Sequence, residues 1–93
     1  MMKRIYQKEY HLKAYLSKKR NVRQGLIVRT RISSKLDDGP STASQLSNKI
    51  NLKYSLIMYH LHLMETEHIV RKTAGRPFFW ELTGAGQKGL LEK

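Results

Sequence analysis

The 93-residue sequence contains no cysteine, which excludes a disulfide framework, a thiolate nucleophile and a cysteine-ligated zinc site. It also lacks any apolar run long enough to span a bilayer. The first residues, Met1-Met2-Lys3-Arg4-Ile5, have no apolar core behind their charges, as a secretion signal would. We therefore expect a cytoplasmic protein without membrane contact, folded as a single domain over residues 1–93.

Acidic residues are few. Seven Asp and Glu stand against eighteen Lys and Arg, so the formal net charge is +11. The excess is greatest in residues 1–36, where eleven cations accompany only Glu9. A positive field of this size attracts polyanions and accelerates their encounter with the protein. Nucleic acid is the expected partner, in preference to anionic lipid or a merely solvated basic surface.

Apolar periodicity predicts two helices in the first part of the chain. Ile5, Leu12 and Leu16 form one stripe at helical spacing, which predicts a helix over 3–18. A second helix is predicted over 22–37. The Asp-Asp-Gly-Pro segment that begins at its end is a stop signal, because Gly often follows a helix and Pro cannot continue one.

A short helix, a tight turn and a longer helix are predicted next. Thr42 and Gln45 have the spacing of a capping box, which predicts a helix over 43–50. Asn51 follows in the turn, since Asn tolerates unusual backbone angles. The longer helix is predicted over 53–67. Its core-facing residues, spaced i, i+4 and i+7, are Ile57, Leu61 and Met64.

The pattern changes to alternation after this helix. Strands are predicted over 69–73 and 78–82, joined by a turn at residues 74–77 that contains Gly and Pro. Alternation places three side chains on the buried face of the second strand: Phe78, Trp80 and Leu82. A short final helix is predicted over 83–92, with Thr83 as its cap and three glycines weakening it. The whole order predicts a mainly α fold with a small β-hairpin, an α+β class.

This order of elements is that of a winged helix. The segment from Thr42 to Val70 resembles the helix-turn-helix of the ArsR, MarR and PadR families. Residues 75–86, with a Gly-Arg-Pro tip and an aromatic-x-Leu-Thr strand end, resemble the wing of the same families. The resemblance covers about residues 26–91. It implies a helix-turn-helix over 42–67 and a wing over 69–82.

The resemblance implies that the longer helix enters the DNA major groove and that the wing reaches the minor groove. With the apolar stripe turned inward, the opposite side of the helix presents Ser55, Tyr59 and His62. Arg76 at the tip suits the negative potential of the minor groove. The alternative for both is an ordinary solvated surface. The expected DNA-binding residues are Thr42, Ser44, Lys53, Tyr54, Ser55, Tyr59, His62, Arg71, Lys72 and Arg76.

One position departs from the family pattern. These families commonly have a Ser or Thr cap where this chain has Lys53. The departure leaves Asn51 as the expected cap of the longer helix. It also places a cation where phosphates would pass.

The N-terminal helix, whose basic extension reaches residue 20, exceeds a minimal winged helix. In related families terminal helices form the dimer interface, and Tyr is frequent at interfaces. We expect a homodimer that reads two half-sites about one helical turn apart. The alternative is that this helix covers its own domain. The expected interface residues are Ile5, Tyr6, Leu12, Tyr15 and Leu16.

Metal binding and catalysis have little support. His60, His62 and His68 raise the question of a metal site, but cysteine is absent and carboxylates nearby are few. No Ser/His/Asp arrangement, phosphate loop or facing carboxylate pair stands out. We expect no metal, no cofactor and no enzymatic activity.

Three functions remain open. The first is a sequence-specific transcriptional regulator, in the form of a repressor that occludes a promoter. The second is a DNA-partition protein that spreads along DNA as a higher-order assembly. In size and basic N-terminus the chain is similar to the winged-helix centromere-binding proteins of archaeal plasmid partition systems. The third is an adaptor that uses the same fold to bind protein. The first two imply a nucleoid-associated location.

Overall fold

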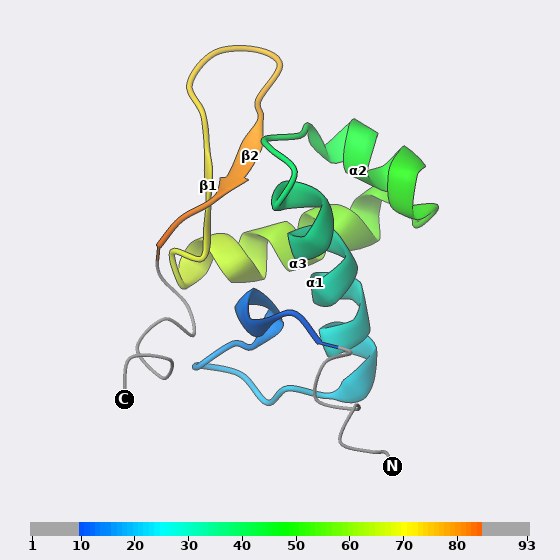
Figure 1. Cartoon of the computed structure of the whole chain (residues 1–93), viewed down its shortest axis with the longest axis vertical. Helices are drawn as coiled ribbons and strands as arrows, with labels where there is room; N and C mark the ends of the chain where they lie inside the picture. Colours follow the sequence, from blue (N-terminus) through cyan, green and yellow to red (C-terminus); the bar gives the residue numbers. More distant parts are fainter. Residues whose placement is uncertain (1–9, 85–93) are drawn as a thin grey trace.

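The computed structural model describes residues 10–84 of the chain. These residues form three α-helices and one antiparallel hairpin, which is the predicted α+β class with a mainly helical body. Figure 1 shows the hairpin projecting from one end of the helices. The elements in chain order are the 3-10 helix η2 (Leu12–Ala14), α1 (Arg23–Leu36), α2 (Ala43–Ile50), α3 (Tyr54–Thr66), β1 (Val70–Lys72) and β2 (Trp80–Leu82).

The predicted start of α2 is confirmed in detail. The Thr42 hydroxyl accepts a hydrogen bond from the backbone N–H of Gln45 at 3.0 Å, and the Gln45 side chain accepts one from the backbone N–H of Thr42 at 3.0 Å. This capping box satisfies two backbone donors that a helix start otherwise leaves unpaired. The start of α2 is thereby fixed just after Ser41, which pairs with Trp80 of β2.

The turn between α2 and α3 confirms the backbone expectation for Asn51 and corrects its predicted role. Asn51 has φ 63° and ψ 48°, the left-handed conformation, and it ends α2. It does not cap α3. Lys53 occupies the N-cap position of α3, and the structure shows no side-chain capping bond there. Because α3 begins at Tyr54, Asn51 lies two residues before the N-cap position.

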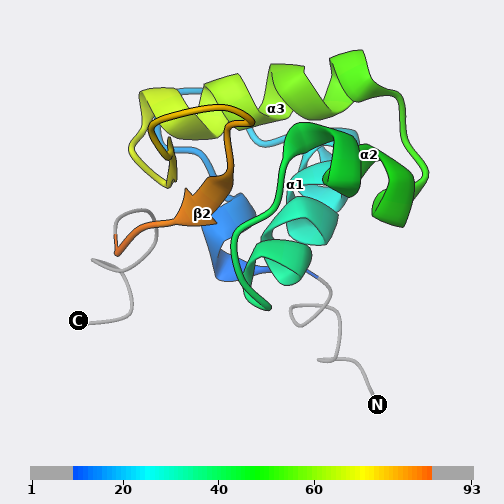
Figure 2. The same ribbon diagram turned by 90° about the horizontal axis from the view of Figure 1, so that it is seen from above.

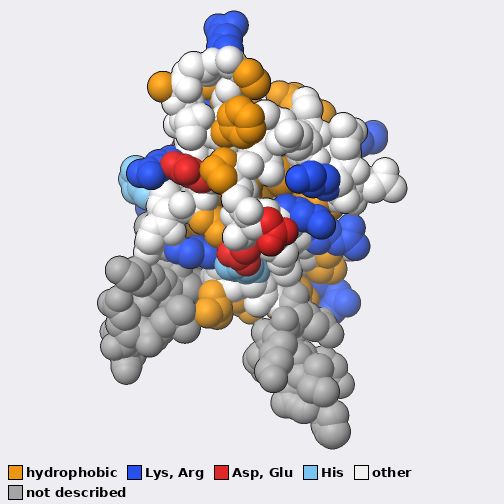
Figure 3. Space-filling model, turned by 45° about the horizontal axis from the view of Figure 1, so that its top comes forward, with side chains coloured by type: hydrophobic (Ala, Val, Ile, Leu, Met, Phe, Trp, Pro, Cys, Tyr) orange, Lys and Arg blue, Asp and Glu red, His pale blue; other side chains and the backbone are white. Residues whose placement is uncertain are grey.

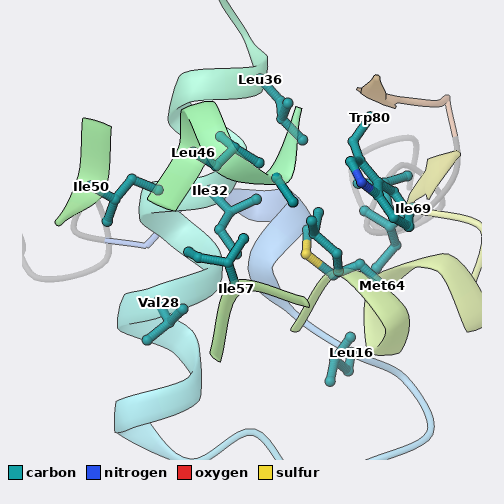
Figure 4. Packing of buried hydrophobic residues seen from close by; sticks show 13 residues of the cluster. Leu16, Val28, Ile32, Leu36, Leu46, Ile50, Ile57, Met64, Ile69 and Trp80 are labelled. Atoms are coloured by element: carbon teal, nitrogen blue, oxygen red, sulfur yellow. The ribbon is translucent and has the colours of Figure 1, made fainter. Parts of the chain in front are cut away.

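The core lies between the inner faces of the three helices and the hairpin. Ile57, Leu61 and Met64 are fully buried, as their spacing predicts. They meet Ile32 of α1 and Leu46 of α2, which are also fully buried. Figure 4 shows Ile57 and Met64 of α3 converging with the side chains of α1 and α2. Burial of each large aliphatic side chain contributes about 1.5–3 kcal/mol, so this contact fixes how α3 sits on α1 and α2.

The hairpin is shorter than predicted and pairs Lys72 with Trp80 at its outer end. Trp80 is buried as expected, and its backbone also exchanges hydrogen bonds with Ser41, at 2.8 and 3.1 Å. Phe78 was predicted to share this buried face, and that prediction is wrong: its side chain is 41 % exposed. The regular ladder ends at the Lys72–Trp80 pair, followed by a single backbone bond from the Thr73 N–H to the Phe79 carbonyl at 2.8 Å, so strict alternation does not extend to Phe78 in the hairpin tip, residues 73–79.

The predicted helix over 3–18 is wrong over its described part. Residues 10–18 contain only the single turn of η2, and Tyr15 has extended backbone angles, φ −81° and ψ 132°. Side chains outside this stretch form hydrogen bonds with backbone N–H and C=O groups that would pair with each other in a helix. Asn21 accepts from the Leu16 N–H at 2.8 Å and donates to the Leu16 carbonyl at 2.9 Å.

Two further predictions concern the ends of the chain. Ile5 and Tyr6 lie outside the described residues, as does the predicted final helix from residue 85 onward. Its expected cap, Thr83, is not helical and donates its hydroxyl to the carbonyls of His68 and Ile69 instead. Thr83 therefore closes the base of the hairpin.

Arg29 holds the N-terminal segment, residues 10–22, against the helices. Its guanidinium is buried, with Nε 2.6 Å from the Ala14 carbonyl and Nη2 3.1 Å from the Asn21 side-chain oxygen. Nη1 lies 3.2 Å from Nδ1 of His60 on α3. A guanidinium only donates, so neutral His60 accepts at Nδ1. Gly25 provides the room, because a Cβ there would lie 2.7 Å from Nη1.

The contact with Arg29 predicts a pH-dependent stability. Burial and the Arg29 charge lower the pKa of His60 from 6.5 to about 4. The stability contributed by neutral His60 is therefore fully present above pH 6.5 and is lost as the pH falls towards 4. We expect the free energy of unfolding in urea to fall over this window, and to fall less in His60→Gln, whose amide oxygen can still accept from Arg29.

His62→Gln is the matched control, because His62 is exposed on the same helix. This variant should keep the pH dependence of the unmodified chain. An equal fall in stability in His60→Gln and His62→Gln would contradict the assignment to His60.

Candidate nucleic-acid interface

A groove of about 480 Å³ opens between the hairpin tip and the first turns of α2 and α3. Three separate segments of the chain line it, and Figure 3 shows a cationic side chain at the top of the molecule, with apolar side chains below it. No carboxylate is found among the described residues that line it. The structure thus brings together five of the predicted DNA-binding residues: Thr42, Ser44, Tyr54, Lys72 and Arg76.

Aromatic rings hold the two cations of this groove. The Lys72 ammonium lies 4.8 Å from the centre of the Phe78 ring and 5.6 Å from the centre of a Trp80 ring. The Arg76 guanidinium carbon lies 5.9 Å from the Phe78 ring. Such contacts contribute about 0.5–1 kcal/mol at exposed sites and restrict the cations without neutralising them. Phe78, which the sequence pattern placed in the core, is instead part of this surface.

The exposed face of α3 lies beside the groove. Ser55, Tyr59 and His62 are exposed there, as predicted, and Tyr59 is 55 % exposed. The His62 ring meets the Trp80 ring edge-on, with centroids 6.1 Å apart, so this face is continuous with the hairpin. Lys53 is exposed at the beginning of the helix. None of these four residues lines the groove.

Arg71 does not join this surface. Its Nε lies 2.6 Å from Oε2 of Glu81, the residue directly opposite on β2. Successive residues of a strand point to opposite faces, so Arg71 and Lys72 diverge. A paired, exposed Arg71 offers less positive charge to a ligand than Lys72 does.

The predicted dimer residues that the structure describes differ in their exposure to solvent. Leu16 is 4 % exposed and belongs to the core of its own chain, so it is not available to a partner, and the prediction for this residue is wrong. At this position the segment covers its own domain. Leu12 is 45 % exposed, and Tyr15 is half-buried with its ring against that of Tyr10, 6.4 Å between centroids.

The three histidines have separate environments. His60 is buried against Arg29, His62 lies on the α3 surface, and His68 occupies a turn with φ 63°. Within residues 10–84, no three His, Asp or Glu side chains gather as metal ligands would. Over the same residues, no helix has the length and apolar character needed to cross a bilayer.

Comparison of the chain with protein-family models, with curated proteins and with solved structures finds no match.

The left-handed turn at Asn51 sets the direction in which α3 leaves α2, and it predicts a selective mutational effect. Asn51→Ala should lower the free energy of unfolding by about 1 kcal/mol, because a Cβ without a polar group disfavours this conformation. Asn51→Gly should remain close to the unmodified chain, because Gly adopts positive φ freely. Urea unfolding of both variants measures the difference. Equal stability of the two would contradict a backbone origin.

Proposed function

We propose that this chain is a winged-helix protein that binds double-stranded DNA, with α3 in the major groove and the hairpin tip over the adjacent minor groove. The observation that carries the proposal is the groove that gathers Lys72 and Arg76 with the first turns of α2 and α3. Duplex DNA is a polyanion, and a basic groove without carboxylates suits its phosphates.

The dimensions and chemistry of α3 support this docking. A helix is about 10–12 Å across with its side chains, and the major groove is about 12 Å wide. The exposed Ser55, Tyr59 and His62 carry hydrogen-bonding groups that suit base edges and phosphates. Lys53 and Tyr54 stand at the N-terminus of the helix, where unpaired N–H groups and the helix dipole favour an anion.

The homodimer remains part of the proposal. A dimer with twofold symmetry would present two copies of α3 to half-sites about one helical turn apart. Leu12 and Val22, which are both large and exposed, are the apolar candidates for its contact in the described N-terminal segment. Light scattering at DNA-binding concentrations tests this state, and a monomer both free and on DNA would contradict it.

The tip cations give the direct test. Arg76→Ala should weaken binding to a selected duplex on the order of tenfold and make the dependence of log Kd on log salt shallower by about one. Arg71→Ala should have a smaller effect, because Glu81 already pairs with Arg71. Fluorescence anisotropy over about 50–200 mM salt measures both quantities.

The matched control is Lys35→Ala, which removes one exposed cation of α1 that does not line the groove. An Arg76→Ala variant with the affinity and salt slope of Lys35→Ala would rule out the tip as a DNA contact.

Selection of bound sequences from random DNA, followed by footprinting over a titration, separates the possible roles. We place a transcriptional regulator first, and it predicts one short protected palindrome that does not grow. Protection that spreads outward with concentration would instead support DNA partition or organisation. Absence of protection at any concentration would contradict DNA binding and support a protein-binding adaptor.

A further inference from the structure

A second basic element lies on the other side of α3. Residues 17–20, here called the basic loop, are Ser17, Lys18, Lys19 and Arg20, and all four are exposed. In Figure 1 the chain between η2 and α1 passes below α3, whereas the hairpin rises above it. Figure 2, seen from above, again places parts of this chain close to α3. The basic loop and the hairpin thus flank α3.

The residues of α3 define these two flanks. Tyr54 and Met58 line the groove beside the hairpin. Leu56 and Leu63 line a second groove of about 330 Å³, which also contains Lys19 and Arg20 of the basic loop. The exposed face that we propose for the major groove therefore lies between two basic borders. Tyr59 belongs to this face and also lines the second groove.

Hydrogen bonds from two side chains, those of Glu67 and Asn21, hold the backbone at the start of the basic loop. One oxygen of the Glu67 carboxylate accepts from the Ser17 N–H at 2.6 Å and its hydroxyl at 2.9 Å, and the other accepts from the Lys18 N–H at 2.9 Å. Burial acts to raise the pKa of Glu67, but these bonds outweigh it and the pKa is lowered. Asn21, fixed by Arg29, holds the residue that precedes the loop.

The cationic side chains remain available while the backbone is fixed. Lys19 and Arg20 have no hydrogen bond or ion pair with any residue in the range 10–84. An anchored loop loses less conformational entropy when its side chains bind an anion. The arrangement is that of a preformed binding element rather than of a mobile tail.

We infer that the basic loop is a second phosphate clamp, which binds the sugar-phosphate backbone on the side of the major groove opposite the hairpin. A helix nearly fills the major groove, so elements on its two flanks face the two strands that border that groove. This inference rests on the proposed DNA binding and deepens it. Phosphate contacts carry no base preference, so the loop contributes affinity and positioning and not sequence choice.

The principal test removes the charge of the loop. Lys18→Gln, Lys19→Gln and Arg20→Gln are combined in one variant of the full chain. We expect the slope of log Kd against log salt to become shallower by about two to three, since each phosphate contact contributes about 0.9. Affinity should fall equally for selected and random duplexes, which fluorescence anisotropy measures.

The matched control removes three cations elsewhere. Arg31, Lys35 and Lys49 are exposed around a separate hollow between α1 and α2 and line neither groove of α3. The corresponding triple Gln variant loses the same charge. Its salt slope should stay near that of the unmodified chain. Equal slopes in the two triple variants would overturn the clamp, because only net charge would then matter. Circular dichroism verifies that both remain folded.

Glu67→Gln separates anchoring from charge. The substitution makes the chain more positive, so general electrostatics predicts tighter binding to any duplex. Loss of the carboxylate that holds Ser17 and Lys18 predicts weaker binding instead. Weaker binding by a folded Glu67→Gln variant supports the preformed clamp, and unchanged or tighter binding contradicts it.

The outcomes distinguish this inference from the proposal beneath it. An unmodified chain that binds no duplex even at low salt would refute the proposed function. Binding that is weakened by Arg76→Ala but unaffected by the loss of the loop charges would refute the clamp alone.

Discussion

The buried guanidinium of Arg29 is the contact on which the arrangement of the described chain depends. It is 3 % exposed, and its hydrogen-bond partners within residues 10–84 are all neutral: the Ala14 carbonyl, the Asn21 amide and the His60 imidazole. Burial lowers the pKa of Arg29, against the opposing influence of the Glu67 charge. A charge withdrawn from water is tolerated only when its hydrogen bonds are made. The need to satisfy Arg29 therefore joins the N-terminal segment to α1 and α3.

A parallel constraint acts at the hairpin through Trp80. Its side chain is part of the core, its backbone bonds to Ser41 just before α2, and its ring meets His62 on α3. The hairpin is thereby fixed to both helices at the base of the groove. A two-stranded hairpin is marginal in isolation, so these contacts stabilise it. Its tip is exposed, and the Phe78 ring lies beside Arg76 of the tip and Lys72 of β1.

These two constraints place cationic side chains on both sides of α3. Trp80 places the hairpin cations on one flank, and Arg29, with Asn21 and Glu67, places the basic loop on the other. Between them the exposed face of α3 carries hydroxyl and imidazole groups. Positive borders around a polar helical face are consistent with a ligand that has two phosphate strands and a readable groove between them.

Sequence alone determined the elements whose signals are local. The capping box at Thr42, the left-handed Asn51 and the helical spacing of Ile57, Leu61 and Met64 predicted α2, the turn and the buried face of α3. Five expected DNA-binding residues do line one groove, and the α+β class is confirmed.

Only the tertiary structure decided the path of residues 10–22, the exposure of Phe78 and the pairing of Arg71 with Glu81. The apolar stripe ending at Leu16 predicted a helix that is not formed. Periodicity shows which residues are apolar, but not which side chains form hydrogen bonds with the backbone groups of the segment. Asn21 binds the backbone of Leu16 from five residues away, whereas Arg29 and Glu67 bind this segment from 15 and 49 residues away, separations that no short sequence window spans.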